Sequence, residues 1–525
     1  MKDNFKCLFI FLFLASSIHT LYSQNNEPNI LLIIADDMGT DAMPGYLESN
    51  RLPITPNLDM LRANGITFTN TWATPSCSPT RAAIMSAKYG IKTGVQRPPG
   101  QLDLVHESIF TKIKENTNGK YAGAVFGKWH ISNPINFNHP TEHGIDHFEG
   151  LISGTVTDYF DWQKTTNGQT SQITEYLTTE LTNNAIDWID EQEQPWFLWL
   201  AHIAPHSPFH VPPEDLFTVG NTNNNVGKFI AMIEAMDAEI GRLLDSMDAE
   251  TRENTIIIFI GDNGTPNGVS QGFPGGHGKA SMYEGGLRVP MVISGNGVGR
   301  INEIDDNLTQ VADLHATILE LTGTQVAGGQ YNSLSLLPLL NSAQDLNREY
   351  IYSDAVIDNT QEWAIRNLEY KLIEDELGNQ EFYNVANDLF EENNLIDNLS
   401  NAEATILAEM EVEAAIIRND WSCQDGIQNG EESMIDNCEE IIISTKDILE
   451  SQILLTPNPS TGNFNIELPN DELVEIRINT IDGKFISSLK GRNVLQIQGL
   501  ETGIYLIQIS FADGTSIIKR QVISK

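Results

Sequence analysis

The 525-residue chain carries 71 acidic and 31 basic side chains, which gives a formal net charge of −40 at neutral pH. So negative a chain excludes nucleic-acid binding, which needs a basic surface, and disfavours adsorption to anionic membranes. The charge suits an exported protein that stays soluble in salty water, and the length allows one large core with one or two smaller modules.

The first residues have the pattern of an export signal. Two lysines precede the apolar run from Cys7 to Ala15, and small or polar residues continue to Ser23. We therefore expect a signal peptide at residues 1–23. The apolar run is too short for a permanent membrane anchor, and no later segment has a transmembrane pattern. Cys7 stands at the beginning of the run rather than after it, which disfavours a lipid anchor there.

Three apolar runs, at 29–35, 196–201 and 255–260, predict strands that are buried on both faces. Helical patterns such as 174–191 lie between them, so the sequence predicts an α/β domain with a largely parallel sheet. Because ligands bind beyond the carboxyl ends of such strands, the residues that follow the first and third runs should share one rim. These are Asp36, Asp37, Asp262 and Asn263. Their hard oxygen atoms suit Ca²⁺ or Mg²⁺ rather than zinc, although each pair alone is also compatible with a cap or turn.

Cys77 stands at the start of a predicted helix. The segment Ser76-Cys-Ser-Pro-Thr80 has the residues of a helix N-terminus, where free N–H groups and the helix dipole favour an anion. Arg81 follows one turn later and can share a face with Cys77. This pairing indicates a nucleophile site; the alternative is a buried structural cysteine.

The other cysteines leave Cys77 without a partner. Cys7 belongs to the predicted signal peptide, and Cys423 and Cys438 are near neighbours that we expect to form a disulfide in an oxidising compartment. A free thiol is unusual in an exported protein, and chemical conversion of Cys77 would account for it.

The segment Cys77-Ser-Pro-Thr-Arg81 resembles the Cys-x-Pro-x-Arg signature of type I sulfatases. The resemblance covers roughly residues 28–400 and implies an alkaline-phosphatase-like α/β fold. That fold has a large mixed, mostly parallel sheet flanked by helices, and a small C-terminal antiparallel subdomain. Two runs depart from the family pattern, at 87–89 and 131–132. Further family motifs follow in the family's order at Gly127–His130, Ala204–Pro208, Gly278–Pro290 and Glu381–Asp388.

The resemblance also implies the chemistry of the site. A formylglycine-generating maturase would oxidise Cys77 to Cα-formylglycine, whose hydrated aldehyde attacks the sulfate sulfur. The family's ion is usually calcium, with magnesium as the alternative. The ligands implied for it are Asp36, Asp37, Asp262, Asn263 and the converted Cys77.

Five further residues form a cationic pocket in the family pattern: Arg81, Lys128, His130, His206 and Lys279. The resemblance assigns Lys128 and Lys279 to sulfate binding. It assigns His130 to the deprotonation that expels sulfate, and His206 to sulfate binding and protonation of the leaving alcohol. Asp262 is a second candidate to accept the proton of the nucleophile. Structural roles are expected for Glu284, Arg288 and His277, and structural or substrate-subsite roles for His202 and His210.

The pattern changes to short strands after about residue 345 and ends in a helix over 402–418. We therefore expect a catalytic domain at 28–345, a smaller subdomain at 346–420 and an acidic linker at 421–452. For the linker a solvated loop is favoured over a calcium site.

Residues 453–525 form a separate module with Asp-Gly and Thr-Gly turns between strand-like runs. Its Pro-Asn-Pro opening and basic end resemble the C-terminal sorting domain of the type IX secretion system of Bacteroidetes. The resemblance implies an appended β-sandwich; a small binding module is the alternative.

The sequence thus predicts a sulfatase that passes through the periplasm to the surface or medium and acts on sulfated carbohydrate. Two alternatives stay open: a phosphonate or phosphate ester hydrolase of the same superfamily, and a non-catalytic surface protein that binds carbohydrate. No catalytic residue of the family pattern is missing, which favours the enzyme.

Overall fold

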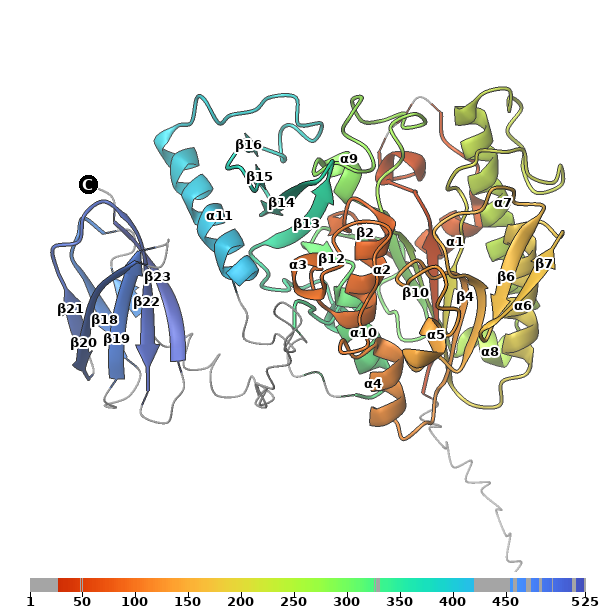
Figure 1. Cartoon of the computed structure of the whole chain (residues 1–525), viewed down its shortest axis with the longest axis horizontal. Helices are drawn as coiled ribbons and strands as arrows, with labels where there is room; N and C mark the ends of the chain where they lie inside the picture. Colours follow the sequence, from red (N-terminus) through yellow and green to blue (C-terminus); the bar gives the residue numbers. More distant parts are fainter. Residues whose placement is uncertain are drawn as a thin grey trace, which may run out of the picture.

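The computed structural model describes residues 27–47, 49, 51–324, 326, 331–419, 454–456, 460–468, 474–480, 484–492, 494–511 and 516–523 (Figure 1). The predicted signal peptide, the predicted linker and the predicted disulfide lie outside the described residues. Within these ranges no helix is both long and apolar enough to cross a membrane.

A ten-stranded mixed sheet forms the centre of the larger part of the molecule, in the order β11-β2-β10-β9-β1-β8-β4-β5-β6-β7. The inner strands β9, β1, β8, β4 and β5 run parallel, and β10, β6 and β7 add antiparallel pairs at the two sides. The strands are β1 (Asn29–Ala35), β2 (Gly65–Phe68), β4 (Ala122–Lys128), β5 (His147–Leu151), β6 (Trp162–Thr166), β7 (Gln169–Ile173), β8 (Trp196–Ala201), β9 (Thr255–Gly261), β10 (Met291–Gly295) and β11 (Glu303–Asp305).

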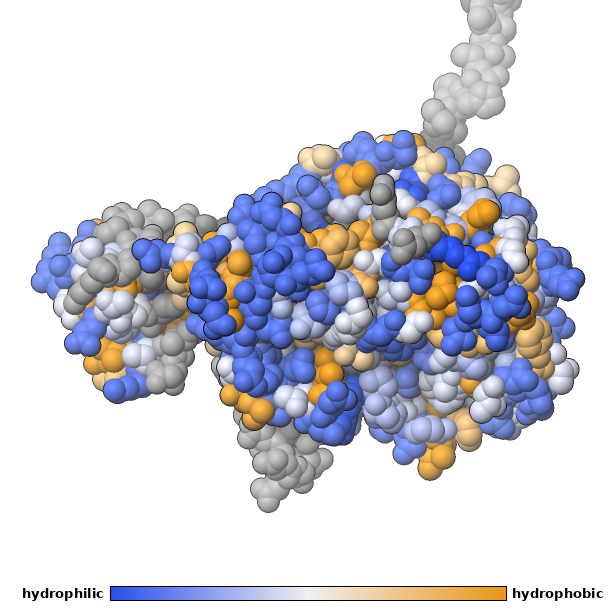
Figure 2. Space-filling view, turned by 90° about the horizontal axis from the view of Figure 1, so that it is seen from above, coloured by the Kyte–Doolittle hydropathy of each residue, from blue (hydrophilic) through white to orange (hydrophobic). Residues whose placement is uncertain are grey.

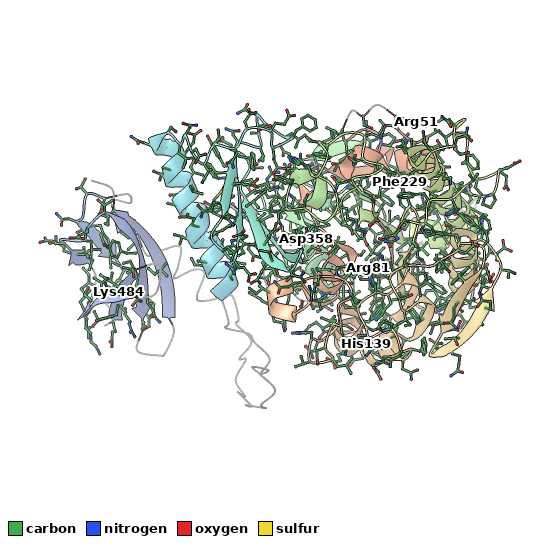
Figure 3. The ribbon with its side chains drawn as sticks, turned by 45° about the horizontal axis from the view of Figure 1, so that its top comes forward. Arg51, Arg81, His139, Phe229, Asp358 and Lys484 are labelled. Carbon is green, nitrogen blue, oxygen red and sulfur yellow. The ribbon has the colours of Figure 1, made fainter. Side chains whose placement is uncertain are left out.

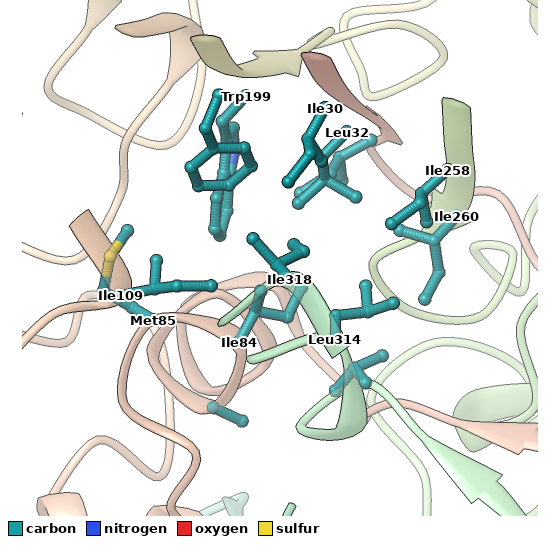
Figure 4. Packing of buried hydrophobic residues seen from close by; sticks show 14 of the residues in the cluster. Ile30, Leu32, Ile84, Met85, Ile109, Trp199, Ile258, Ile260, Leu314 and Ile318 are labelled. Atoms are coloured by element: carbon teal, nitrogen blue, oxygen red, sulfur yellow. The ribbon is translucent and has the colours of Figure 1, made fainter. Parts of the chain in front are cut away.

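Side chains of β1 alternate between two cores, one on each face of the sheet. Ile30, Leu32 and Ile34 pack on the first face against α2, α4 and α10 (Figure 4). Leu31 and Ile33 pack on the second face against α1, α6 and α7. These helices are α1 (Pro56–Ala63), α2 (Cys77–Ser86), α4 (Ile109–Asn116), α6 (Leu177–Asp190), α7 (Asn225–Ser246) and α10 (Asp313–Leu321).

Short elements complete this part of the chain. They are η1 (Thr40–Ala42), β3 (Thr71–Trp72), α3 (Gly90–Thr93), α5 (His139–Glu142), α8 (Ala249–Glu253), α9 (Glu284–Leu287), β12 (Thr309–Gln310) and η2 (Leu337–Leu340). The predicted α/β class is confirmed, and so are the strands at 29–35 and 196–201, which have the predicted bounds. The helix predicted over 174–191 is shorter, because the chain enters α6 only at Leu177, whose N–H donates to the Tyr159 carbonyl at 2.9 Å.

A four-stranded antiparallel sheet follows, as expected for the region after residue 345. It consists of β13 (Ile351–Ile357), β14 (Thr360–Arg366), β15 (Lys371–Asp375) and β16 (Gln380–Tyr383), and α11 (Asn401–Asn419) packs on it. A second core joins the opposite face of this sheet to Leu287 and Met282 of the preceding domain. The small sheet is thereby fastened to the segment that carries Lys279.

The C-terminal part contains two antiparallel sheets that share one core, which confirms the predicted β-sandwich. One sheet has the order β17-β18-β21 and the other β20-β19-β22-β23. The strands are β17 (Leu454–Thr456), β18 (Phe464–Glu467), β19 (Val474–Thr480), β20 (Phe485–Gly491), β21 (Val494–Ile497), β22 (Gly503–Ser510) and β23 (Ser516–Ile523).

Hydrophilic residues cover most of the face seen in Figure 2, and apolar residues appear there as separate small areas. This surface agrees with the net charge of −40. Cations are also present in the interior: Arg81, labelled in Figure 3, lies within the large domain and is fully buried.

Candidate active site

The helix α2 carries Cys77 in its first turn. All of its residues are buried, and Cys77 is only 2 % exposed and has a free thiol. The preceding turn is held by Thr80, whose Oγ1 accepts the Thr74 N–H at 3.0 Å. Ser76 occupies the N-cap position, but its side chain makes no capping hydrogen bond. The end of the helix dipole at Cys77 is therefore not screened by a capping side chain.

The parallel pairing of β1 with β9 brings the two polar strand ends together. The strands are in register up to their last residues, so Asp36 and Asp37 lie beside Asp262 and Asn263. The Asp37 N–H donates to Asp262 Oδ1 at 3.1 Å. Asn263 Nδ2 donates to Asp37 Oδ1 at 2.8 Å. The common rim expected from the sequence is therefore present.

The donor atoms of this rim fit a hard divalent cation. Asp36 Oδ1 and Asn263 Oδ1 are both buried, and neither has a hydrogen-bond partner among the described residues. A buried oxygen without a partner is costly, and Ca²⁺ is an ion that such oxygens bind. One candidate ligand atom from each of four residues lies within 4.8 Å of the others, and these residues are Asp36, Asp37, Cys77 and His206. His206 was not among the ligands expected from the sequence.

Two lysines neutralise the two adjacent carboxylates. Lys128, the last residue of β4, is buried and its Nζ contacts Asp36 Oδ2. Lys279 Nζ contacts Asp37 Oδ1 and lies 3.8 Å from the Cys77 sulfur. Burial lowers the pKa of each lysine, but the neighbouring carboxylate more than offsets this and raises it. Both side chains are therefore cations at neutral pH.

Arg81 connects the strand ends to the helix. Its Nη2 lies 2.8 Å from Asp262 Oδ2 and 4.0 Å from Asp36 Oδ2, and its Nη1 donates to the Lys128 carbonyl at 2.6 Å. The guanidinium thus fixes the end of β4 relative to the end of β9. With Lys128 and Lys279 it balances three carboxylates by three cations.

Burial and neighbouring charges shift the pKa values of the side chains in this site in different directions. Although burial raises the pKa of Asp36, the charges of Lys128 and the other cations lower it well below its usual range. Burial, followed by the charge of Asp36, raises the pKa of Asp262 to about 6. Burial raises the pKa of the Cys77 thiol to about 11, so the unmodified residue is a neutral thiol at pH 7.

The two histidines of the predicted pocket differ in their surroundings. Burial and the nearby Lys128 charge lower the pKa of His130 to about 2, so its imidazole is neutral. Its Nδ1 has no hydrogen-bond partner among the described residues. His206 Nδ1 lies 2.7 Å from the Ser207 carbonyl, which leaves Nε2 toward Asp37 at 3.7 Å. His130 therefore leaves Nδ1 without a partner in the described part of the chain, and His206 presents Nε2 to the site.

Several residues that hold these histidines were not predicted. Ser78 Oγ donates to the His130 carbonyl at 2.7 Å, and Gly154 lies directly against the His130 ring. Tyr159 Oη donates to the His206 carbonyl at 2.7 Å. Ser78 adjoins Cys77, so its place in the signature was a usable signal. The other two contacts join distant segments and have no local pattern.

The remaining polar residues of the family motifs have structural contacts. Glu284 is fully buried and accepts hydrogen bonds from Trp72 Nε1 at 3.1 Å and Arg366 Nη1 at 2.9 Å. His277 stacks on Tyr283 with ring centroids 3.8 Å apart. His210 packs on Tyr159 with ring centroids 4.2 Å apart, and Arg288 Nε lies 3.7 Å from Glu284 Oε2. His202 is buried, and its ring nitrogens have no hydrogen-bond partner among the described residues.

Models of known families match different regions of the chain. The secretion system C-terminal sorting domain matches residues 455–524, and this module directs secretion or surface attachment. A model of the N-sulphoglucosamine sulphohydrolase C-terminal region matches residues 273–419.

Individual relatives cover most of the remaining chain. Human N-acetylgalactosamine-6-sulfatase is 28 % identical over 366 residues, which span 62 % of this chain and 68 % of the relative. The uncharacterized sulfatase YdeN of Escherichia coli is 26 % identical and spans 61 % of this chain and 67 % of the relative.

Solved structures share the fold. The structure of Ps i-CgsB with a neocarrahexaose is 25 % identical, has a TM-score of 0.66 and covers 75 % of this chain and 93 % of that chain. A structure in complex with D-glucosamine-2-N,6-O-disulfate is 20 % identical, has a TM-score of 0.62 and covers 75 % of this chain and 99 % of that chain. Because the identity is low, this similarity supports the fold alone. The sulfatase family model itself matches residues 28–324, more than half of the chain and the stretch that holds every residue of the site described above. The chain therefore belongs to the sulfatase family of hydrolases.

Proposed function

We propose that the protein hydrolyses sulfate esters of carbohydrates with a formylglycine made from Cys77. The observation that carries the proposal is an unpaired cysteine, buried among three carboxylates and three cations at a helix N-terminus. As a thiol with a pKa near 11, Cys77 is a poor nucleophile at neutral pH. Oxidation by a maturation enzyme replaces the thiol with an aldehyde, whose hydrate carries two hydroxyl groups.

In the first proposed step, one hydroxyl of the hydrate attacks the sulfur of the ester and the S–O bond to the sugar breaks. Asp262, with its pKa raised to about 6, accepts the proton of the attacking hydroxyl. His206, with Nε2 toward the site, gives a proton to the departing alcohol. Lys128, Lys279 and Arg81 stabilise the charge that develops on the sulfate oxygens.

In the second step, the neutral His130 removes the proton of the remaining hydroxyl, so that the C–O bond to sulfate breaks and the aldehyde returns. Addition of water regenerates the hydrate and completes the cycle. A thiol has no second hydroxyl and therefore offers no such route to release sulfate.

The metal proposed for the site is calcium, with magnesium as the alternative. Asp36, Asp37, Asn263 and the converted Cys77 would hold it, with His206 close by. Asp262 is proposed as a further ligand because of its place at the end of β9, although its oxygens accept hydrogen bonds from the Asp37 N–H and from Arg81. When bound, such an ion supplies positive charge that polarises the nucleophile and the sulfate.

A sulfated carbohydrate is the proposed substrate class. Support comes from a relative named for N-acetylgalactosamine 6-sulfate and from a similar structure solved with a neocarrahexaose. The sorting module supports export through the periplasm, after which the enzyme would meet polymeric glycans outside the cell.

Mass spectrometry of the peptide that contains Cys77, taken from active enzyme of the native host, tests the nucleophile. We expect the aldehyde or its hydrate. Cys77→Ala should abolish turnover of 4-nitrophenyl sulfate while the melting temperature and most sulfate binding are kept, because the cations remain. An unmodified thiol in fully active enzyme would overturn the proposal.

Cys77→Ser tests the loss of the nucleophile without a loss of packing, because serine fills nearly the same space as cysteine. We expect this variant to be inactive or to stop as a sulfated enzyme, unless the maturase also accepts serine. Comparison of 4-nitrophenyl sulfate with 4-nitrophenyl phosphate tests the superfamily alternative, since faster turnover of the phosphate would favour a phosphate ester hydrolase.

A further inference from the structure

We propose that a cavity beside His130 and His206 binds an unsulfated sugar unit that neighbours the sulfated one in the substrate. This inference rests on the proposed function and adds to it the kind of glycan that the enzyme recognises. The cavity has a volume of about 460 Å³ and lies between the segment after β5, the strands β6 and β7, and the loop that precedes α5. Its volume falls within the range of about 300–1,000 Å³ that is usual for ligand pockets.

The segment 151–155 borders both the cavity and the candidate active site. Ser153 and Thr155 line the cavity, whereas Gly154 between them lies so close to the His130 ring that a Cβ there would be 2.2 Å from Nε2. Thr155 Oγ1 also donates to the Ser207 carbonyl at 3.1 Å, next to His206. This one segment thus separates the cavity from the two histidines proposed to act on the nucleophile and on the departing alcohol.

One wall of the cavity consists of exposed hydrogen-bonding side chains. Gln163 of β6 and Gln172 of β7 are direct cross-strand partners, and both line the cavity. Gln172 Nε2 donates to Asp161 Oδ1 at 2.6 Å, which orients the amide. Amide and carboxylate groups side by side offer both donors and acceptors, which is the pattern that sugar hydroxyls need. Trp162 and Phe137 supply apolar area on the same cavity.

The charge of the lining selects against a second sulfate. Asp161 is the only charged side chain among the residues that line the cavity, and it is negative. The cations of the site are held instead at the strand ends, where Lys128 and Lys279 contact Asp36 and Asp37. An anionic sugar unit would meet only repulsion in the cavity, whereas a neutral unit finds hydrogen-bond partners there.

The test compares formylglycine-bearing enzyme on three kinds of substrate. These are 4-nitrophenyl sulfate, sulfated monosaccharides such as N-acetylgalactosamine 6-sulfate, and defined oligosaccharides of carrageenan, chondroitin sulfate and heparan sulfate. We expect an oligosaccharide whose sulfated unit has an unsulfated neighbour to have the highest kcat/KM, at least about tenfold above its own sulfated monosaccharide. The same oligosaccharide with a sulfate on the neighbour should be a poorer substrate.

Two variants connect this preference to the cavity. Gln163→Leu/Gln172→Leu should lower kcat/KM for the preferred oligosaccharide about tenfold more than for 4-nitrophenyl sulfate, since hydrogen bonds to the neighbouring unit are lost. Asp161→Asn should reduce the difference in kcat/KM between oligosaccharides whose neighbouring unit is unsulfated and those whose neighbouring unit is sulfated. The matched control is Gln169→Leu, which lies on β7 but does not line the cavity and should leave both ratios unchanged.

The outcomes separate this inference from the proposed function. Loss of all sulfate ester hydrolysis in matured enzyme would overturn the function itself. Three other results would overturn the cavity assignment and leave the function in place. The first is hydrolysis of 4-nitrophenyl sulfate with no higher kcat/KM for any oligosaccharide, and the second is a higher kcat/KM when the neighbouring unit is sulfated. The third is an equal loss of kcat/KM in the Gln163/Gln172 variant and in the Gln169 variant.

Discussion

Gly154 is a residue whose lack of a side chain determines where His130 lies. A Cβ at this position would be 2.2 Å from both Nε2 and Cε1 of the imidazole. Gly154→Ala should therefore displace the ring and lower kcat by about 10²-fold, because a shift of about 1 Å at a catalytic group has an effect of that size. Steady-state kinetics and thermal unfolding measure the two effects separately.

A matched substitution controls for the general effect of replacing glycine. Gly220 has open space around its Cα, so Gly220→Ala should leave kcat unchanged. Full activity of Gly154→Ala would show that His130 does not need its present position.

The two buried oxygens without partners, on Asp36 and Asn263, predict a measurable effect of calcium on stability. Calcium at about 100 times its dissociation constant should raise the free energy of unfolding by about 2.7 kcal/mol. Asn263→Ala should abolish most of this gain. Melting temperatures with calcium, magnesium or a chelator decide between the two ions, and an equal calcium response in the variant would contradict the assignment.

At the scale of single residues, the sequence predicted the acidic rim well because the rim follows from strand register. Asp36 comes directly after β1 and Asp262 directly after β9, and parallel pairing of the two strands places such residues together. The supports of the site were not predictable, because Thr155 and Tyr159 act through contacts with segments about 50 residues away that leave no periodic signal.

At the scale of elements, buried ionic contacts fasten the small antiparallel sheet to α9. Lys371 of β15 lies 2.7 Å from Glu391 and 3.3 Å from Glu284, and the Glu284 N–H donates to Glu391 Oε2 at 2.5 Å. Although burial raises the pKa of Glu284, the charges of Arg366 and Lys371 lower it to about 2. Burial and the Glu284 charge raise the pKa of Glu391 to about 7.

These opposite shifts predict a pH dependence of stability. The folded protein binds the Glu391 proton more tightly than the unfolded chain, so the contribution of Glu391 falls as pH rises from 4.5 to about 7. Glu284 is shifted the other way, and its contribution is lost as pH falls from 4.5 to about 2.

Glu391→Gln isolates the first of these effects. The glutamine keeps a hydrogen-bond acceptor but does not titrate, so the variant should lose less stability than the wild type between pH 5 and 7, by on the order of 3 kcal/mol. Denaturant unfolding at several pH values measures the difference. Parallel pH profiles for the two proteins would show that Glu391 does not titrate in this range.

Among the secondary-structure elements, buried strands were predicted reliably from apolar runs in the sequence. The strands β1 and β8 were predicted with the bounds that the structure has, because strands buried on both faces read as continuous apolar sequence. The strand β7 was not identified, since four of its five residues are exposed and its sequence is almost wholly polar. That strand carries part of the cavity wall, so the proposed sugar-binding surface was hidden from sequence patterns.

For the whole molecule, the hydrophobic cores indicate that catalysis and sorting are separable. Among the described residues, the core of the C-terminal module is built only from residues at 455 and beyond, and the proposed site residues lie between 36 and 279. Removal of 453–525 should therefore leave kcat/KM for 4-nitrophenyl sulfate unchanged in purified enzyme. In the native host the same truncation should abolish surface delivery, which fractionation of cells and medium measures.

Two other outcomes of this truncation would contradict these expectations. A clean truncation that loses hydrolysis while it keeps its melting temperature would show that the C-terminal module contributes to the site. Unchanged surface delivery would instead remove the sorting role proposed for residues 453–525.

The burial of Cys77 has a consequence for how the enzyme is made. The thiol is 2 % exposed, and Lys279, which lies against it, comes 202 positions later in the chain. A modifying enzyme can therefore reach the thiol only before this packing closes. At a synthesis rate of about 5–20 residues per second, that interval lasts roughly 10–40 s. The proposed oxidation of Cys77 would therefore compete with folding, and a chain that folds first would keep an unmodified thiol.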